Sequence, residues 1–261
     1  MKNTALITGA SSGIGRELAR IHAERGGDLV LVARREKALN ELKSKLEQKH
    51  SIQVLVIVKD LTTPTAAREV YEAIKAEGIQ VDYLINNAGF GGQGTFHERD
   101  WNTELAMIQL NIVALTELCH LLIPEFVERK SGRILNVSST ASFPPGGPLQ
   151  SVYYATKHYV TAFSHGIAQE LKGANVTVTT LMPGATETEF AKTSGMEKTV
   201  LFSKTASSLP VAQDGYDAML KGQLEVVTGL PLSLRFLMPI MKFLPKTLIL
   251  KEIHRIQKVR Q

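Results

Sequence analysis

Tyr153 and Lys157 lie four residues apart in the segment VYYATKHYV, so on a helix they would share one face. An ammonium group beside a phenol favours the phenolate and so lowers the pKa of the tyrosine. Because an unperturbed tyrosine titrates near pH ~10, such a shift would let Tyr153 transfer protons closer to neutrality. The spacing is also common on ordinary helix surfaces, so the rest of the chain has to decide whether the pair is catalytic.

A glycine-rich stretch near the N-terminus, TGASSGIG, follows an apolar run and precedes a helical pattern. Glycines permit a tight turn and a close approach of the backbone, and the start of a helix offers free N–H groups to a pyrophosphate. The alternative is a plain glycine-rich turn. The strand–loop–helix context favours a dinucleotide site, with these contacts: Gly9, Ser11, Ser12, Gly13, Ile14 and Gly15.

The second apolar run ends in Ala33, Arg34 and Arg35, about where NAD-binding sites carry an acidic residue for the ribose hydroxyls. A guanidinium group suits a 2′-phosphate, which an acidic residue would repel. We therefore expect NADP(H) rather than NAD(H), with Arg34 as the contact. The alternative is a solvated arginine pair at the start of a helix.

Two further polar motifs follow later apolar runs. Asp60 and Leu61 are expected to contact the adenine, although Asp60 could equally cap a helix. Asn87, Ala88 and Gly89 belong to the motif NNAG, in which small residues permit close approach of a cofactor and an asparagine can tie neighbouring strands together.

Apolar β-branched runs alternate with helical patterns along the chain. Strands are predicted over residues 4–9, 28–34, 53–60, 81–89, 132–139, 175–184 and 226–229, and helices over 12–25, 36–50, 64–77, 101–127 and the Tyr153 segment. This pattern predicts an α/β fold, a single-domain, doubly wound parallel sheet (Rossmann-like) with helices on both faces and a C-terminal helical extension. In such sheets ligands bind beyond the carboxyl ends of the strands, where the polar motifs above lie. Residues 1–230 form the dinucleotide-binding and catalytic domain in this prediction, and residues 231–261 are an extension packed on it.

Composition limits the class of protein. The 261 residues are 44% hydrophobic and 21% charged, and the single cysteine, Cys119, argues against a disulfide framework. We see neither a signal peptide nor an apolar run long enough for a transmembrane helix, and so expect a cytoplasmic protein. The formal charge is +5, but residues 231–261 hold seven basic residues and one acidic residue, +6 in total, which leaves −1 for the rest. No nucleic-acid surface is therefore expected on the body of the protein.

Taken together, these motifs resemble those of the short-chain dehydrogenase/reductase family. The match includes TGASSGIG, NNAG, Asn111 in LNIVA, Ser139 in NVSS, Tyr153-x-x-x-Lys157, and Pro183-Gly184 with Thr188, in the family's order over about residues 4–190. The resemblance implies a homo-oligomeric, nicotinamide-dependent oxidoreductase in which Pro183, Gly184 and Thr188 also contact the cofactor.

The resemblance also implies the roles of four catalytic residues. Tyr153 would be the general acid/base, and Lys157 would lower its pKa and hold the nicotinamide ribose. Ser139 would hydrogen-bond the substrate oxygen, and Asn111 would hold a water in a proton relay from the lysine. Without the family pattern, Asn111 could satisfy a buried helix and Ser139 could be an ordinary hydroxyl at a strand end.

The substrate side is less well determined. Residues 188–209 are rich in Gly, Ser, Thr and Lys and are expected to form a mobile lid, the alternative being a passive surface loop. Four apolar residues could line a hydrophobic pocket: Phe143, Pro144, Pro145 and Phe190. None of the seven histidines has a convincing metal-binding partner, so no metal is expected.

The basic tail forms an amphipathic helix in this prediction, starting near Leu248 with Ile249, Ile253 and Ile256 on its apolar side. Peripheral membrane contact, packing between subunits and a cover over the substrate entrance are the three interpretations.

The predicted function is an NADP(H)-dependent oxidoreductase that transfers a hydride between the nicotinamide and a ketone, aldehyde or secondary alcohol, with a hydrophobic or oxoacyl substrate. An oxidative direction is an alternative, because the tyrosine serves both ways. The alternative from another class is a non-catalytic NADP(H)-binding module that acts as a redox sensor or a scaffold.

Overall fold

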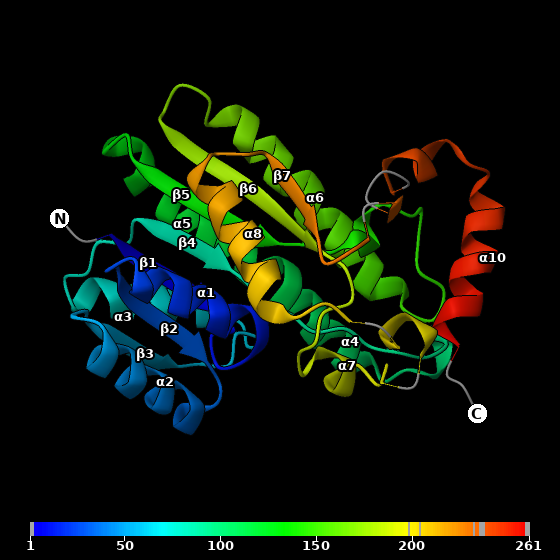
Figure 1. Ribbon diagram of the computed structural model, residues 1–261, viewed down its shortest axis with the longest axis horizontal. Helices are drawn as coiled ribbons and strands as arrows, with labels where there is room; N and C mark the ends of the chain where they lie inside the picture. Colours follow the sequence, from blue (N-terminus) through cyan, green and yellow to red (C-terminus); the bar gives the residue numbers. More distant parts are fainter. Residues whose placement is uncertain (1–2, 198, 204, 232, 235–237, 259–261) are drawn as a thin grey trace.

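The computed structural model describes residues 3–197, 199–203, 205–231, 233–234 and 238–258. Seven parallel strands form one sheet in the order β3-β2-β1-β4-β5-β6-β7 (Figure 1). The strands are β1 (Thr4–Thr8), β2 (Asp28–Ala33), β3 (Val54–Val58), β4 (Tyr83–Asn86), β5 (Gly132–Val137), β6 (Val176–Pro183) and β7 (Glu225–Thr228). The direction of winding reverses between β1 and β4, which is where ligands bind in doubly wound sheets.

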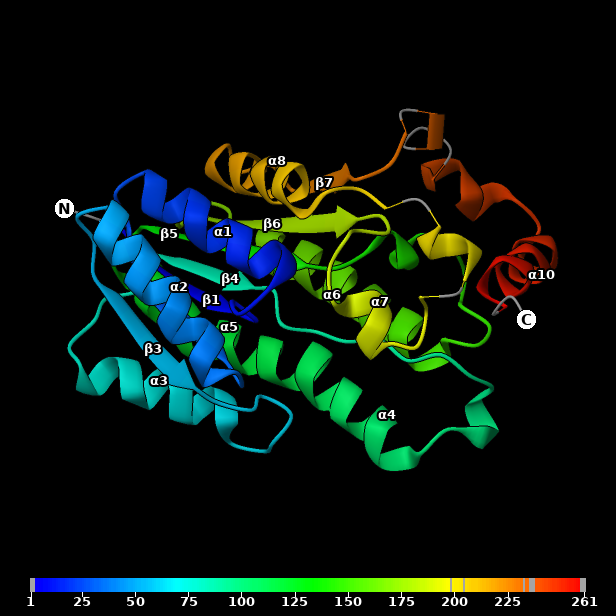
Figure 2. The same ribbon diagram turned by 60° about the horizontal axis from the view of Figure 1, so that its bottom comes forward.

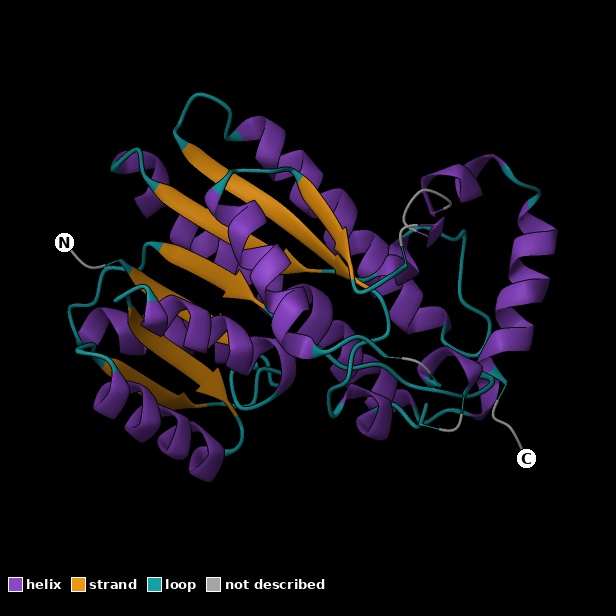
Figure 3. Cartoon of the chain, in the orientation of Figure 1, coloured by secondary structure: helices purple, strands orange, loops and turns teal. Residues whose placement is uncertain are grey.

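Helices cover both faces of the sheet (Figure 3), as the alternating pattern predicts. Their bounds are α1 (Gly13–Glu24), α2 (Glu36–Lys49), α3 (Ala66–Ala76), α4 (Trp101–Ile108), α5 (Leu115–Glu128), α6 (Ser151–Glu170), α7 (Phe190–Thr193), α8 (Ser208–Leu220) and α10 (Lys246–Gln257). Of these, α7 and α8 are missing from the sequence prediction. Figure 2 shows α1, α2 and α8 on one side of the sheet and α3 and α5 on the other.

Each face of the sheet has its own hydrophobic core. The core under α1, α2 and α8 includes Leu18, Leu42 and Met219. The opposite core, under α3, α5 and α6, includes Ile74 and Phe126. Because the strands are buried on both sides, they are continuous apolar runs rather than alternating ones.

One long helical stretch connects the sheet with the site. From Trp101 to Glu128, α4 and α5 run on from each other through a π-helical segment, Gln109–Ala114. Within the described residues this stretch is the one that could cross a membrane by length and composition alone, and 39% of its most apolar window is buried. Leu118, Leu122 and Phe126 pack in the core beneath the sheet, so this end of the stretch is part of the globular fold.

Candidate active site

A cavity of about 790 Å³ opens at the carboxyl ends of the strands. The predicted site residues that line it are Gly9, Ser11, Ser12, Gly13, Ile14, Arg34, Asp60, Leu61, Asn87, Ala88, Gly89, Ser139, Tyr153, Lys157, Pro183, Gly184 and Thr188. Gly15 and Asn111 are the two that do not. The fold therefore brings motifs from 180 residues of sequence to one place.

The glycine loop has the geometry of an anion site. Gly9 and Gly13 adopt φ values of +67° and +53°, which other residues rarely adopt. Helix α1 starts at Gly13 with no side-chain cap and no acidic residue in its first turn, so its N–H groups can bind a phosphate. Gly15 lies behind the loop, where a Cβ would come within 2.4 Å of the Gly9 carbonyl oxygen. These residues fit the pyrophosphate of a dinucleotide.

A threonine that the sequence analysis missed ties this loop to the NNAG motif. The N–H groups of Asn87 and Ala88 both donate to Thr8 Oγ1 at 3.0 Å, and Asn87 Nδ2 donates to the Thr8 carbonyl at 3.0 Å. The available signal was the position of Thr8, a polar residue between a buried strand and the first glycine. Thr8 therefore fixes the backbone of the NNAG motif next to the glycine loop, where a cofactor would lie.

The two arginines lie at the rim of the cavity. Arg34 has a side chain 70% exposed, with Nη1 3.7 Å from Asp60 Oδ2. Arg35 donates to Ser11 Oγ at 3.0 Å and to Glu189 at 2.7 Å. A guanidinium group that pairs with carboxylates in this way can also receive a phosphate dianion.

Asp60 shapes its loop rather than capping a helix, so that alternative is wrong. Its Oδ1 accepts hydrogen bonds from the Thr62 N–H at 3.0 Å and the Thr62 hydroxyl at 2.8 Å. Burial opposes ionisation of Asp60, but these bonds and the nearby Arg34 outweigh burial and lower its pKa. The N-cap of the next helix, α3, is Thr65.

Tyr153 lies on α6 with its phenol buried in the cavity wall, in the neighbourhood of the Ser139 hydroxyl. Burial raises the pKa of Tyr153 to about 12, and the Ser139 hydroxyl opposes this rise. The expected lowering by Lys157 is therefore not what this structure shows. Lys157 Nζ donates to the Val137 carbonyl at 2.9 Å and lies 5.8 Å from the centre of the Tyr153 ring. Burial lowers the pKa of Lys157 to about 8.

Asn111 sits in the π-helical segment and reaches two other elements. Its Nδ2 donates to the Phe90 carbonyl at 2.9 Å and to Thr156 Oγ1 at 3.1 Å, while its Oδ1 accepts from the Phe90 N–H at 3.2 Å. A Cβ added to Gly89 would lie 3.0 Å from Asn111 Oδ1 and 3.5 Å from Lys157 Nζ, so both groups face this glycine. The amide thus holds the loop after β4 rather than merely satisfying its own helix.

The structure distinguishes the two neighbouring serines. Ser138 is buried and its Oγ bonds to the Lys157 carbonyl at 2.9 Å and to Thr161 Oγ1 at 2.7 Å. Both serines line the cavity, but Ser139 is the more exposed of the two, and its Oγ accepts from the Ala141 N–H at 3.1 Å. Ser138 is a structural residue in this arrangement, and Ser139 is the hydroxyl that can meet a substrate.

The far end of the cavity is largely apolar. Of the four residues predicted there, Pro144 and Phe190 line it and the other two do not; the Phe190 ring lies 5.4 Å from that of Tyr153. Further wall residues that were not predicted from the sequence as site residues are Leu110, Gln150, Tyr154, Met196, Phe202, Met238, Met241, Ile253 and Ile256. The last four come from the tail, so one side of the tail covers the cavity, which was one of the three interpretations.

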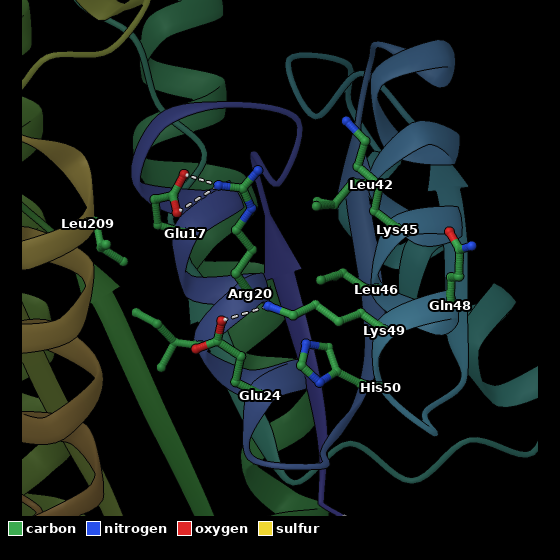
Figure 4. Close-up of a pocket in the computed structure, with 11 residues that line it drawn as sticks. Glu17, Arg20, Glu24, Leu42, Lys45, Leu46, Gln48, Lys49, His50 and Leu209 are labelled. Atoms are coloured by element: carbon green, nitrogen blue, oxygen red, sulfur yellow. Dashed lines mark hydrogen bonds and ion pairs between the residues drawn. The ribbon is translucent and has the colours of Figure 1, made fainter.

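A second hollow, of about 650 Å³, lies between α1 and α2 (Figure 4). Four of its charged residues pair with one another, Arg20 with Glu17 at 3.1 Å and Lys49 with Glu24 at 3.8 Å. None of the predicted site residues lines it. Across the described parts of the chain, no group of three His, Cys, Asp or Glu side chains could hold a metal ion.

Comparisons with known proteins agree on one family. A family model for short chain dehydrogenases matches residues 3–199. Dehydrogenase/reductase SDR family member 7B of Mus musculus is 35% identical over 233 residues, 85% of this chain and 72% of that protein. Very-long-chain 3-oxoacyl-CoA reductase of Bos taurus is 32% identical over 194 residues, 72% of this chain but only 61% of that enzyme. A short-chain dehydrogenase from Sphingobium yanoikuyae, solved in complex with NADPH, is 31% identical with a TM-score of 0.82, and the match covers 99% of this chain and 97% of that one.

Proposed function

Because the chain belongs to the short-chain dehydrogenase/reductase family of oxidoreductases, we propose that it reduces a hydrophobic ketone, aldehyde or oxoacyl group with NADPH. One observation carries the proposal. The same cavity joins the glycine loop and the arginines to the half-buried Ser139 and the buried Tyr153, and continues between apolar walls. A site of this shape brings a dinucleotide and an apolar carbonyl compound together.

The bound nicotinamide would supply the hydride, and the protein supplies position and the proton. Tyr153 is protonated at neutral pH, since its pKa is raised to about 12, and so can donate its proton to the carbonyl oxygen. Ser139, which lines the cavity beside the same phenol, would donate a hydrogen bond to that oxygen as negative charge develops. Lys157 would hold the nicotinamide ribose, and Asn111 keeps the loop after β4 in place through its bonds to Phe90.

The preference for NADPH rests on the rim of the cavity. Neither Ala33 nor either arginine next to it would repel a 2′-phosphate, and Arg34 is exposed enough to turn toward one. The phosphate dianion would compete with Asp60 for Arg34 and with Glu189 for Arg35. The neighbour from Sphingobium yanoikuyae, in complex with NADPH, supports this preference.

The substrate class rests on the walls of the cavity. Phe190, Phe202 and Met241 lie on the side of Tyr153 that a substrate would occupy, together with isoleucines of α10. The relative from Bos taurus acts, by its name, on a very long oxoacyl chain, which suits such a surface. An oxoacyl or other long apolar carbonyl compound is therefore the substrate we propose.

A homo-oligomer is also part of the proposal. The stretch from α4 to α6 exposes Trp101, Leu105, Val113 and Tyr159. Large apolar side chains that share neighbouring helices often mark an interface between subunits.

Replacing Tyr153 by Phe tests the catalytic role. We expect kcat to fall by about 10²–10⁴-fold, because the proton donor is lost. The dissociation constant for NADPH, measured by fluorescence titration, should be unchanged. Tyr71→Phe, on α3 and outside the cavity, is the matched control and should keep full activity. A Tyr153→Phe variant with near wild-type kcat would refute the role. Failure of wild type to oxidise NADPH with any of a panel of apolar ketones and aldehydes would favour the non-catalytic module.

A further inference from the structure

The C-terminal segment, residues 238–258, forms part of the molecular surface at one end of the protein. Figures 1 and 2 both show α10 at the end of the molecule remote from α2 and α3. Its inner side is buried, with Ile249 and Ile253 packed in a cluster that includes Tyr153 and Tyr154. The helix is therefore attached to the rim of the cavity and not a separate arm.

Polar contacts fix the orientation of this helix. Gln257 is fully buried. Its side-chain Nε2 donates to Tyr154 Oη at 2.7 Å, and its backbone carbonyl accepts from Gln93 Nε2 at 2.6 Å. Gln93 in turn accepts a bond from Gln150 at 3.2 Å. Because both apolar and polar contacts hold the inner side of α10 against the protein, the residues on its outer side face away from the protein.

Large apolar side chains are exposed at the start of this segment. We call Ile240, Phe243, Leu244 and Leu248 the outer patch; they are 51%, 77%, 45% and 64% exposed. They fall within nine consecutive residues, so they form a compact tip rather than scattered exposed residues. Apolar tips of this kind mark places where a surface meets another phase or partner.

Lysines lie next to the outer patch and along the rest of α10 as far as its C-terminal end. Lys246, Lys251 and Lys258 are exposed, and within the described segments none of them makes an ion pair. At about 100° per residue, Lys251 lies about 160–200° around α10 from Ile253 and Ile249, so it points away from the protein. Arg255 pairs with Glu252 at 2.5 Å on the same outer side.

We propose that the outer patch and these lysines dock the protein on an anionic bilayer surface. Side chains of this size enter the boundary between headgroups and acyl chains, and ammonium groups flanking them bind anionic headgroups. Charge complementarity favours an anionic surface, because residues 231–261 carry +6 while the rest of the chain carries −1, and the exposed apolar side chains beside the lysines suit a bilayer rather than a polar groove. The same segment lines the cavity through Met241 and Ile253, so docking would bring an apolar site close to the lipid phase.

Vesicle co-sedimentation of the full chain tests the proposal, and it does not depend on the reaction being identified. Wild type is expected to bind vesicles of phosphatidylcholine mixed with phosphatidylglycerol, to bind phosphatidylcholine alone much more weakly, and to dissociate as salt rises. The double variant Leu244→Asp/Leu248→Asp should bind at least about tenfold more weakly. Charge reversal at Lys251 and Lys258, both to Glu, should also weaken binding about tenfold or more without touching the apolar tip.

The matched control is Leu209→Asp/Leu224→Asp, because these leucines are 51% and 48% exposed on other elements. It should bind vesicles like wild type, and NADPH binding by every variant serves as the check on folding. No sedimentation of wild type with anionic vesicles, or equal losses in the control, would overturn the proposal. So would a patch variant that still binds lipid but changes from oligomer to monomer in sedimentation velocity, since the patch would then join copies of the chain.

Discussion

Replacing Lys157 by Met should make the protein without cofactor more stable at neutral pH. The lysine is buried with one hydrogen bond, to the Val137 carbonyl, and burial lowers its pKa from 10.5 to about 8. At 1.36 kcal/mol per pKa unit this corresponds to about 3 kcal/mol of unfavourable free energy for the charged form. Loss of the bond to Val137 costs about 1 kcal/mol, so Lys157→Met should gain about 2 kcal/mol at pH 7.

The pH dependence gives the sign of the effect. Between pH 8 and pH 10.5 the unfolded chain still binds the lysine proton and the folded protein has lost it, so wild-type stability rises with pH through this window. The advantage of Lys157→Met should therefore be largest below pH 8 and disappear by about pH 10.5.

Urea unfolding at pH 7 and pH 10, without cofactor, measures this difference, and turnover assays should show that Lys157→Met has lost most activity. The control is Lys172→Met, at an exposed lysine just beyond α6, which should leave stability unchanged at both values. A Lys157→Met protein less stable than wild type at pH 7, or a difference that does not change with pH, would refute the reasoning.

Three further variants examine the rest of the site. Arg34→Asp should weaken NADPH binding by about tenfold or more while NADH binding changes little, because the new carboxylate repels only the 2′-phosphate. Fluorescence titration with both nucleotides measures the two dissociation constants. If their ratio is unchanged, Arg34 is not part of the cofactor site. Ser139→Ala should lower kcat by about 10²-fold with no loss of stability. Ser138→Ala should keep kcat and lower the free energy of unfolding by about 1–3 kcal/mol. The opposite pattern would reverse the two assignments.

The sheet and its cofactor end were predictable because each motif there is contiguous in sequence. A buried parallel strand is a continuous apolar run, and the polar residues after it lie at the binding edge whatever the order of strands. Helix α8 was missed for a local reason. It contains Pro210 and Gly215, which obscure a helical pattern, and Gly215 is needed where a Cβ would come within 2.7 Å of Leu181.

The substrate end could not be predicted in the same way, because its wall combines segments about 100 residues apart. Phe190 and Ile253 reach the cavity only through tertiary packing. The pKa of Tyr153 was predicted in the wrong direction for the same reason. The spacing to Lys157 is visible in sequence, but the burial that raises the pKa depends on distant residues, and the ammonium turns to Val137.

Because of the π-helical segment Gln109–Ala114, the number of residues in one helix determines where the site residue Asn111 points. A π turn holds one residue more than an α turn and leaves the flanking helices in line. A chain that lacked one residue there could form an uninterrupted α-helix and keep the packing of α5, yet Asn111 would move around the axis, away from Phe90 and Thr156. Single-residue insertions and deletions in this helix would thus separate folding from catalysis, since the fold tolerates a change in residue count that the site does not.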